Sequence, residues 1–526
     1  MYLNGKVLVG KTKDGKELSI LLDKANRHGV ITGASGTGKT ITLKVMAESF
    51  SAAGVPVFLA DVKGDLAGTA KKGESNDSII KRLEGLKIKD FDFDQYPVRF
   101  WDLYQRSGHA LRASIYDIGP SILSIMLGLS EVQEGVLTIC YRIAKDEGKM
   151  LYDIEDLKAL LVYVGEHRQE YTLKYGNITT QSIGVIQRSL LALEDQGADK
   201  FFGLPSLDIN DFMTNDTDGK GYINVLDAIE LFNSPDLYAS FLLWLLTKLF
   251  NELPEVGDLD KPKLVFFFDE AHLLFDNMPA YRLKQVVQIV KLIRSRGIGL
   301  YFISQSPTDI PDEIIAQLGN RVQHNLRAYT PNELKSVKVS AASFRANPKF
   351  DTEKAIIELG TGEALVSFQN DKGEPEIVEK VTVLPPQSMM GTLDDMERNR
   401  IINNSSLCGK YEETIEKEDA AHLVLGKIRE EEQAKKEEEE KKKEEERLAK
   451  EQAKKEEEER KAQEKEMREL AKKEKEEERA KEKALKEAEK AKKNDPMYKL
   501  GKKALNSAET KVINKGLNAI LKKLWK

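Results

Sequence analysis

The stretch Gly33-Ala34-Ser35-Gly36-Thr37-Gly38-Lys39-Thr40 fits the phosphate-loop pattern GxxxxGK[ST]. The apolar residues Val30 and Ile31 precede it, and the amphipathic run ITLKVMAESFSAAG follows it, as a strand and a helix would. Glycines let consecutive backbone N–H groups curl around phosphates, and the amino end of the helix adds positive potential. Lys39 would reach the β- and γ-phosphates, and the Thr40 hydroxyl would bind Mg²⁺. Residues 33–40 are therefore predicted to bind ATP and Mg²⁺.

Three further apolar strands predict the sheet to which this loop belongs. They are VPVFLADV at 55–62, KLVFFFDE at 263–270 and GLYFISQS at 299–306. Unbroken apolar runs such as LVFFF are typical of strands that are covered on both faces, as in a parallel sheet. With helices between the strands, the predicted fold class is α/β, with a mainly parallel sheet around a phosphate-binding loop.

Polar residues follow two of these strands. Asp269 and Glu270 close the LVFFF strand, and Gln305 closes the GLYFIS strand. Because ligands of open α/β sheets bind at the carboxyl ends of the strands, these side chains should face the phosphate loop. We expect Asp269 to hold Mg²⁺ through water, Glu270 to act as general base, and Gln305 to sense the γ-phosphate. The alternatives are an acidic pair that caps a helix and a glutamine that satisfies a strand end.

Four other charged residues are candidates on less evidence. Asp61 ends the second strand, where it could reach the attacking water or the metal, or could have a structural partner instead. Arg294 and Arg296, in IRSRGIG, could form an arginine finger that enters the site of a neighbouring subunit. Cations also stabilise a helix C-terminus, which is the structural alternative. Arg321 is a further candidate for the finger.

The composition bounds the class of protein. The net charge of -6, from 81 basic and 87 acidic side chains, lacks the basic excess that is common in DNA-binding domains. Cys140 and Cys408 form no metal-binding or disulfide pattern. The apolar stretch FLLWLLTKLF at 241–250 is too short to span a bilayer, and the first residues have no apolar core of signal-peptide length. These features predict a cytoplasmic protein.

The chain divides into regions of different character. Residues 1–69 and 221–400 contain the motifs of the predicted core, whereas residues 70–220 predict a mainly helical insertion, because apolar residues recur at three- and four-residue spacing. Residues 401–429 would be a linker. Residues 430–493 consist of Lys and Glu blocks that place opposite charges at i,i+4, and they predict one long solvated helix, with disorder as the alternative. A coiled coil is poorly supported because no heptad seam is sustained.

Residues 497–526 predict a second helix, which is basic and amphipathic. Its apolar stripe includes Leu505, Leu517 and Leu524, and Lys502 and Lys515 lie among the lysines of the other side. Such a helix suits an anionic membrane surface or the groove of a partner protein. Packing against the chain's own core is the alternative.

Taken together, the motifs resemble those of the HerA–FtsK superfamily of ring-forming motor ATPases. The matching motifs are GASGTGKT, FLADVKGDLAG, LVFFFDEAH, RSRGIGLYFISQSP and LGTGEALVS. The stretches PVRFWDLYQRSGHALRAS and QEGVLTICYRIAKDEG resemble the bacterial HerA-helicase-like members more closely. The resemblance covers residues 1–400. It implies a RecA-like core, a hexameric ring and translocation along double-stranded DNA.

By this resemblance, the nucleotide-binding residues of the family fall on Lys39, Thr40, Asp61, Asp269, Glu270 and Gln305, and the finger falls on Arg296 or Arg294. About 30 residues precede Gly33, too few for the β-barrel with which archaeal HerA-type motors dock a nuclease. We expect an ATPase motor that moves a polymer, with DNA as the first choice. Its rivals are a membrane- or partner-tethered ATPase that acts on protein and a nucleotide-gated scaffold.

Overall fold

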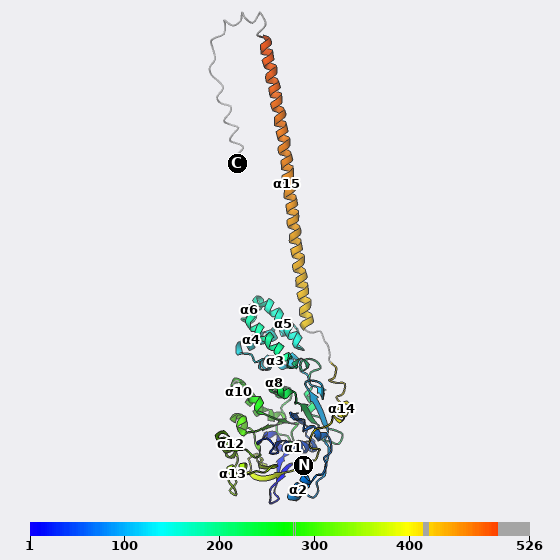
Figure 1. The fold of residues 1–526 in the computed structure, drawn as a ribbon, viewed down its shortest axis with the longest axis vertical. Coiled ribbons are helices and arrows are strands. Elements are labelled where there is room, and N and C mark those ends of the chain that lie inside the picture. The colour runs from blue at the N-terminus through cyan, green and yellow to red at the C-terminus, as the bar shows by residue number, and fades with distance from the viewer. Residues whose placement is uncertain (277, 279, 414–419, 493–526) are drawn as a thin grey trace. The chain divides into compact units, whose positions relative to one another are not determined.

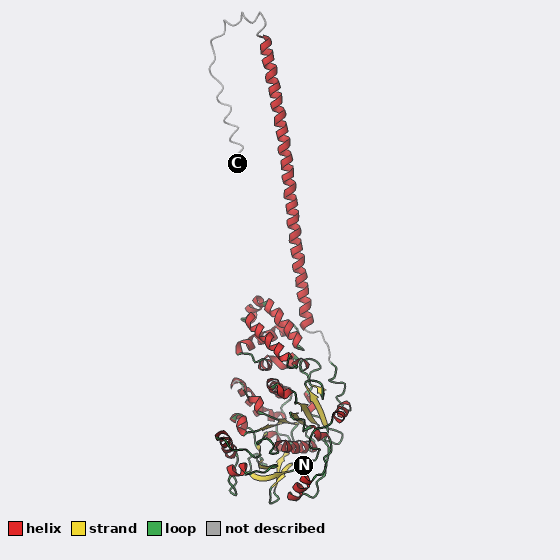
Figure 2. Cartoon of the chain, in the orientation of Figure 1, coloured by secondary structure: helices red, strands yellow, loops and turns green. Residues whose placement is uncertain are grey.

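The computed structural model describes residues 1–276, 278, 280–413 and 420–492 (Figure 1). The chain forms two units, Met1–Ile428 and Arg429–Lys526, and each is described by itself. Figure 2 shows the strands of the first unit among helices, whereas the described part of the second unit is helical.

One sheet of 13 strands organises the described residues of the first unit. Eight neighbouring strands are parallel, and their spatial order is β11(Asn320–Gln323), β4(Gly29–Thr32), β10(Ile298–Ser304), β9(Leu264–Phe268), β5(Val57–Asp61), β8(Ile223–Asp227), β6(Val98–Asp102) and β7(His109–Ala110). An antiparallel extension adjoins β11 and consists of β12(Glu363–Ser367), β13(Glu379–Val383), β2(Lys6–Lys11), β1(Tyr2–Leu3) and β3(Glu17–Leu21). The α/β fold with a mainly parallel sheet is confirmed.

Both faces of the sheet are buried, as the unbroken apolar strands predicted. Successive side chains of a strand point to opposite faces. Phe266 and Phe268 of β9 belong to the core on the face covered by α8(Pro235–Glu252) and α10(Ala280–Leu292). Val265 and Phe267 belong to the core on the other face, under α1(Lys39–Ala52). The carboxyl end of β9 is therefore fixed from both sides.

Residues 70–220 form six α-helices and also contribute two strands, β6 and β7, to the sheet. The helices are α2(Asp77–Gly85), α3(Ile115–Met126), α4(Glu131–Asp146), α5(Ile154–Glu166), α6(Arg168–Tyr175) and α7(Thr180–Glu194). Helices α3 to α6 gather as one group, drawn in cyan in Figure 1. The two strands show that this region is partly continuous with the core. The predicted boundaries at 69/70, 220/221 and 400/401 stay a prediction.

Shorter helices complete the first unit. They are α9(His272–Phe275), α11(Asp312–Ile315), α12(Pro331–Ala342), α13(Thr352–Ile357) and α14(Asp395–Asn403). The Thr330 side chain accepts the Glu333 N–H at the start of α12, and the Glu333 carboxylate accepts the Thr330 N–H, which forms a capping box. This cap fixes the point at which the chain turns from β11 into α12.

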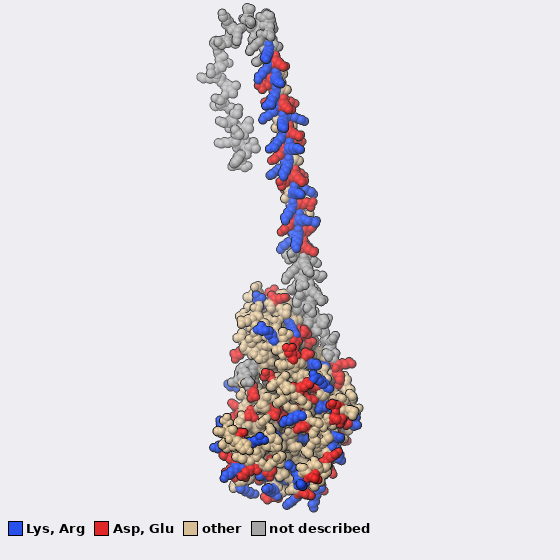
Figure 3. Space-filling model, in the orientation of Figure 1, with Lys and Arg blue, Asp and Glu red and all other residues tan. Residues whose placement is uncertain are grey.

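The predicted long charged helix is confirmed, and most of it belongs to the second unit. Helix α15(Ala420–Lys492) has 73 residues, and Figure 3 shows Lys and Arg interspersed with Asp and Glu along its described surface. Opposite charges pair at i,i+4, as between Lys461 and Glu457 at 2.8 Å and between Lys486 and Glu482 at 3.0 Å. The predicted terminal helix at 497–526 lies outside the described residues. Among the residues that are described, no helix combines enough length with enough apolar character to cross a membrane.

Candidate active site

The phosphate loop connects β4 to α1, as predicted. Gly36 and Gly38 have positive φ angles of 78° and 114°, which a residue with a Cβ would adopt only with strain. The Lys39 Nζ donates hydrogen bonds to the carbonyl oxygens of Gly33 at 2.6 Å and Ala34 at 3.2 Å. Partial burial lowers the pKa of Lys39, while the nearby Glu270 and Asp269 raise it. The Lys39 ammonium group thus lies against the loop whose bound phosphates it is expected to contact.

The residues that follow β11 form hydrogen bonds with the phosphate loop and with α1. The Ala34 N–H donates to the Asn325 carbonyl oxygen at 2.8 Å. The buried His324 ring contacts the Thr42 hydroxyl at 2.8 Å through Nε2 and the Glu363 carbonyl oxygen at 3.0 Å through Nδ1. Burial lowers the pKa of His324 to about 4. His324 is therefore a neutral framework residue, and its hydrogen bonds join the first helix to the edge of the parallel strands.

Asp269 follows β9 and lies at the same edge of the sheet as the phosphate loop. The surrounding protein and the Glu270 charge raise the pKa of its carboxyl to about 7, against the lowering effects of a hydrogen bond from the Glu270 N–H at 2.9 Å and of the Lys63 and Lys39 charges. The anionic form of this carboxyl is unfavourable in the structure as it stands. A cation bound beside the phosphate loop would stabilise it.

Glu270 is held in an uncommon backbone conformation. Its φ of 49° is left-handed, a strained region that non-glycine residues seldom adopt and that is frequent at active sites. The Ala271 N–H donates to the Ile303 carbonyl oxygen at 2.8 Å and ties this turn to β10. The Glu270 Oε2 is buried without a hydrogen bond among the described residues, and the His272 Nδ1 lies 3.5 Å from it. A buried carboxylate oxygen with spare accepting capacity is what a general base needs.

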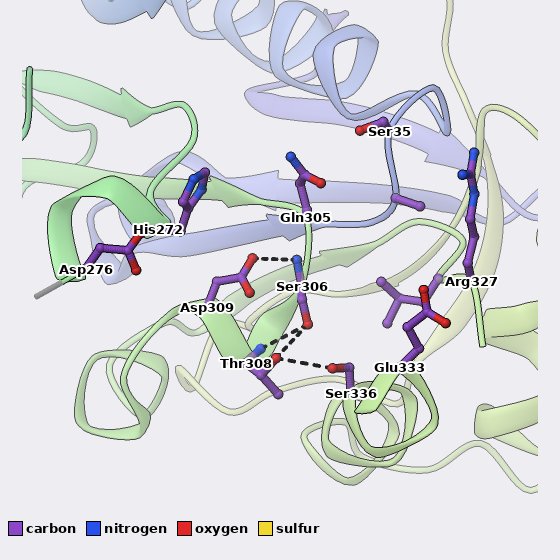
Figure 4. Close-up of a pocket in the computed structure, with 12 residues that line it drawn as sticks. Ser35, His272, Asp276, Gln305, Ser306, Thr308, Asp309, Arg327, Glu333 and Ser336 are labelled. Atoms are coloured by element: carbon purple, nitrogen blue, oxygen red, sulfur yellow. Dashed lines mark hydrogen bonds between the residues drawn. The ribbon is translucent and has the colours of Figure 1, made fainter. Parts of the chain in front are cut away.

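Gln305 lies at the end of β10 and opens into a cavity of 670 Å³ beside the phosphate loop (Figure 4). The cavity also touches Ala34, Ser35, His272 and Asp276. The predicted Gln305 thus shares one space with the tip of the loop, as a sensor of the γ-phosphate would. Its assignment as a sensor stays a prediction.

Asp61 has contacts of a different kind. Its carboxylate accepts the backbone N–H groups of Gly64 at 2.7 Å and of Leu66 and Ala67 at 3.1 Å. Burial and the Asp65 charge raise its pKa to about 6, although the three hydrogen bonds lower it. These contacts organise the turn after β5 and favour the structural alternative; none of them supports the predicted catalytic role.

The predicted finger residues lie at the opposite edge of the sheet. Arg294 and Arg296 occupy a 3₁₀ turn, Ile293–Arg296, which precedes β10, whereas the phosphate loop and the acidic pair follow their strands. The Arg296 guanidinium donates to the Leu253 carbonyl oxygen and lies 5.0 Å from the Phe250 ring centroid. The structure therefore does not bring either arginine to the site of its own chain.

Arg321, the further candidate for the finger, is also held within its own chain. Its guanidinium donates to the carbonyl oxygens of Leu318, Ser343 and Ile315. These three hydrogen bonds hold the Arg321 side chain against the residues that precede β11 and against the end of α12.

A family comparison agrees with this geometry. The model of the family described as "Helicase HerA-like C-terminal" matches residues 6–504. The chain belongs to this HerA-like helicase family. Its fold is the RecA-like P-loop core that the resemblance implied, and the protein is a P-loop ATPase by family and by the arrangement of its loop and acidic pair.

This HerA-like chain is similar to one curated protein and to several solved structures. The DNA double-strand break repair helicase HerA of Sulfurisphaera tokodaii is 23% identical over 379 residues, covering 70% of this chain and 67% of the relative. The plasmid coupling protein TrwB, solved with a non-hydrolysable ATP analogue, has a TM-score of 0.47 and 14% identity, covering 75% of this chain and 97% of TrwB. VirB4 of Thermoanaerobacter pseudethanolicus has a TM-score of 0.47 and 15% identity, covering 76% and 99%.

The donor groups of the HerA-like site fit Mg²⁺. The pKa of Asp269 stays raised despite the Lys63 and Lys39 charges, and the Glu270 Oε2 accepts no hydrogen bond from the described residues, so a further cation would stabilise this acidic pair. Oxygen donors are the ligands that Mg²⁺ prefers, and it is commonly held by one or two protein groups together with phosphates and water. Among the described residues, no three His, Cys, Asp or Glu side chains gather as metal ligands. Two protein ligands, as predicted with Thr40 and Asp269, would be enough for a Mg²⁺ ion that is also bound by phosphates and water.

Two cationic residues near this HerA-like site were not predicted from the sequence. Lys63 is exposed after β5, and its charge acts on both Asp269 and Lys39. Arg327 is exposed after β11 and lines the cavity that contains Gln305. Lys63 lies inside the motif FLADVKGDLAG, and this position after a strand was a signal that could have indicated it. Arg327 follows a short strand whose place next to β4 could not be read from the sequence.

Proposed function

We propose that this protein is an ATP-hydrolysing motor that translocates on double-stranded DNA as a ring of identical subunits, most simply a hexamer, in the cytoplasm. The observation that carries the hydrolytic part is the buried, unpartnered Oε2 of Glu270 at the same sheet edge as Lys39. Nucleotide binding alone would not require a carboxylate at that position. The DNA and the ring are supported by membership of the HerA-like family and by the name of the Sulfurisphaera relative.

The chemistry would be an in-line attack of water on the γ-phosphate. Residues 33–40 bind the triphosphate, and Lys39 turns from the loop carbonyls to the β- and γ-oxygens. Thr40 and Asp269 would hold Mg²⁺, which would supply positive charge to offset that of the phosphates. Glu270 orients the water and accepts its proton, and Gln305 contacts the γ-phosphate. An arginine of a neighbouring subunit, Arg294 or Arg296, completes the site.

Arg294 and Arg296 suit this role only in a ring. Because they lie at the amino edge of the strands, they cannot reach the carboxyl edge of their own sheet. A position away from the site of its own subunit is compatible with a finger supplied in trans. Arg296 would first have to leave the Leu253 carbonyl oxygen, which makes Arg294 the better choice.

The test is steady-state ATP hydrolysis by the full chain with duplex DNA, single-stranded DNA, RNA or liposomes added. We expect strong stimulation by duplex DNA, and near-complete loss of turnover in Glu270→Gln and Lys39→Ala. Turnover at the parental rate in Lys39→Ala would disprove the site. Stimulation by liposomes alone would instead support a tethered ATPase, and slow turnover that no polymer changes would support a nucleotide-gated scaffold.

A further inference from the structure

The cavity beside the phosphate loop has one cationic side chain in its lining. Twelve described residues line its 670 Å³, and among them only Arg327 carries Lys or Arg charge. The lining also contains three acidic residues, Asp276, Asp309 and Glu333. Figure 4 shows Arg327 rising along one side of the cavity toward the level of Ser35, with Gln305 between it and His272. A triphosphate held by the loop would therefore meet one positive charge in this space.

Arg327 is placed by direct bonding between its segment and the phosphate loop. Strands β11 and β4 are parallel, with Gln323 beside Thr32, so both chains leave the sheet at the same edge. The His324 N–H donates to the Thr32 carbonyl oxygen at 2.7 Å, and the Ala34 N–H donates to the Asn325 carbonyl oxygen at 2.8 Å. Arg327 follows the second bond by two residues. Its backbone position is thereby fixed relative to the loop.

Two of the three acidic residues of the cavity, Asp309 and Glu333, accept hydrogen bonds from groups other than Arg327. Asp309 accepts the Ser304 hydroxyl at 2.6 Å and the Ser306 N–H at 2.9 Å. Glu333 accepts the N–H groups of Tyr329 at 2.9 Å and Thr330 at 2.8 Å. The pKa of Glu333 is lowered by its hydrogen bonds from Thr330 and Tyr329 and, to a smaller extent, by the Arg327 charge. Among the described residues, the Arg327 guanidinium nevertheless has no hydrogen bond and no ion pair within 4 Å, so its N–H donors are available to a ligand.

We propose that Arg327 binds the terminal phosphate of the triphosphate held by its own phosphate loop and so makes the site favour ATP over ADP. This inference rests on the proposed function, because it needs a triphosphate on residues 33–40. A guanidinium is permanently charged and presents a planar pair of N–H donors that matches two phosphate oxygens. The cavity extends from Ala34 and Ser35 to Gln305, which is the side of the loop where the γ-phosphate would lie. ADP lacks the group that Arg327 would contact.

The test measures equilibrium binding of a non-hydrolysable ATP analogue and of ADP, each with Mg²⁺, to the full chain and its variants. Arg327→Ala should weaken binding of the ATP analogue about 10-fold or more, while the Kd for ADP stays within about 2-fold, since a charged hydrogen bond contributes on this scale. Arg327→Lys should recover part of the loss, because it keeps the charge but not the planar donor pair. Lys335→Ala is the matched control: Lys335 is exposed on α12 and does not line the cavity.

The outcomes separate this inference from the proposed function. Equal weakening of ATP-analogue and ADP binding in an Arg327→Ala variant that keeps the parental melting temperature would overturn it, because the effect would then not depend on the γ-phosphate. Unchanged affinities for both nucleotides would overturn it as well, and would leave the ATPase assignment standing. If the parent chain bound neither nucleotide, the proposed function and this inference would both fail. The ADP affinity also reports folding, because a misfolded variant would lose both ligands.

Discussion

The Gly362 N–H donates a hydrogen bond of 3.0 Å to the Thr37 carbonyl oxygen. The turn before β12 is thus hydrogen-bonded to the phosphate loop, although the two are far apart in the sequence. Gly362 has a φ of 76°, and the Arg82 guanidinium lies over it, donating to the carbonyl oxygens of Thr361 at 3.3 Å and Val383 at 3.2 Å. The loop GASGTGKT therefore depends on LGTGEALVS for its shape.

Gly362→Ala should loosen this support. An added Cβ would lie 2.1 Å from the Arg82 Nη1, so the arginine must move, and the left-handed φ adds strain of roughly 1–2 kcal/mol. We expect a lower melting temperature and weaker ATP binding, measured by thermal unfolding and nucleotide titration. Gly360→Ala is the control, because its Cβ would meet only the Glu363 side chain, at 3.5 Å or more. Equal behaviour of the two variants would contradict the proposed support.

Glu270→Gln should separate binding from hydrolysis. The amide keeps the size and the strained backbone position of Glu270 but cannot accept a proton from water. We expect turnover to fall by roughly 100- to 10,000-fold, the range that general-base groups contribute. ATP affinity, measured by titration, should stay close to that of the parent protein, because residues 33–40 are unchanged. Retained turnover would place the base elsewhere.

Asp61→Ala should lower stability before it affects chemistry. It removes the acceptor of three backbone N–H groups in the turn after β5, and each buried unsatisfied donor costs roughly 1–3 kcal/mol. We expect a clear fall in melting temperature, with turnover largely kept well below that temperature. Asp65→Ala, in the same turn, should have little effect. Loss of turnover without loss of stability would restore the catalytic role that the sequence suggested.

Arg294 and Arg296, the first two candidates for the finger, should respond differently to substitution. Arg296 bonds the Leu253 carbonyl oxygen and lies against the Phe250 ring, so Arg296→Ala should destabilise the fold by roughly 1–3 kcal/mol. Arg294→Ala should leave the melting temperature nearly unchanged and reduce turnover by more than 100-fold if Arg294 acts on a neighbour. Mixing inactive Arg294→Ala with inactive Lys39→Ala should restore part of the activity. Absence of any recovery in the mixture would contradict action in trans.

His28 should make the fold sensitive to acid. Its Nδ1 accepts the Leu300 N–H at 3.1 Å, so Nε2 donates to the Val290 carbonyl oxygen at 2.8 Å, and the ring must be neutral. Burial lowers its pKa to about 4. The unfolded chain binds the proton first, so the stability from His28 is complete above about pH 6.5 and falls as the pH drops toward 4.

His28→Gln tests this pH dependence. The variant cannot titrate, so the difference in melting temperature between it and the parent protein should shrink as the pH is lowered from 7.5 to 4.5. The comparison is needed because His324 has a lowered pKa as well and adds to the acid sensitivity of both proteins. A difference that stays constant with pH would show that His28 does not contribute.

The sequence predicted the local features of the site well, because each has a strong local cause. The glycine-rich loop and the LVFFF strand with its acidic pair are short-range patterns, and the structure has β4, β9 and β10 where they predict strands. The order of the strands is a long-range property. Nothing near residues 320–327 indicates that β11 lies beside β4, and Arg327 was missed for that reason. The contacts of Asp61 likewise depend on a turn that only the folded backbone defines.

In the charged helix α15, length and rotation follow from the regular backbone of an α-helix. Its described side chains are exposed, so contacts with other side chains of the described protein do not determine their orientation. Its 73 residues, at about 1.5 Å each, span roughly 110 Å. Deleting one residue would shorten the helix by about 1.5 Å and rotate everything after it by about 100°. Deleting seven would keep nearly the same rotation while shortening the helix by about 10 Å. Reach and angular phase can therefore be varied independently at this one element.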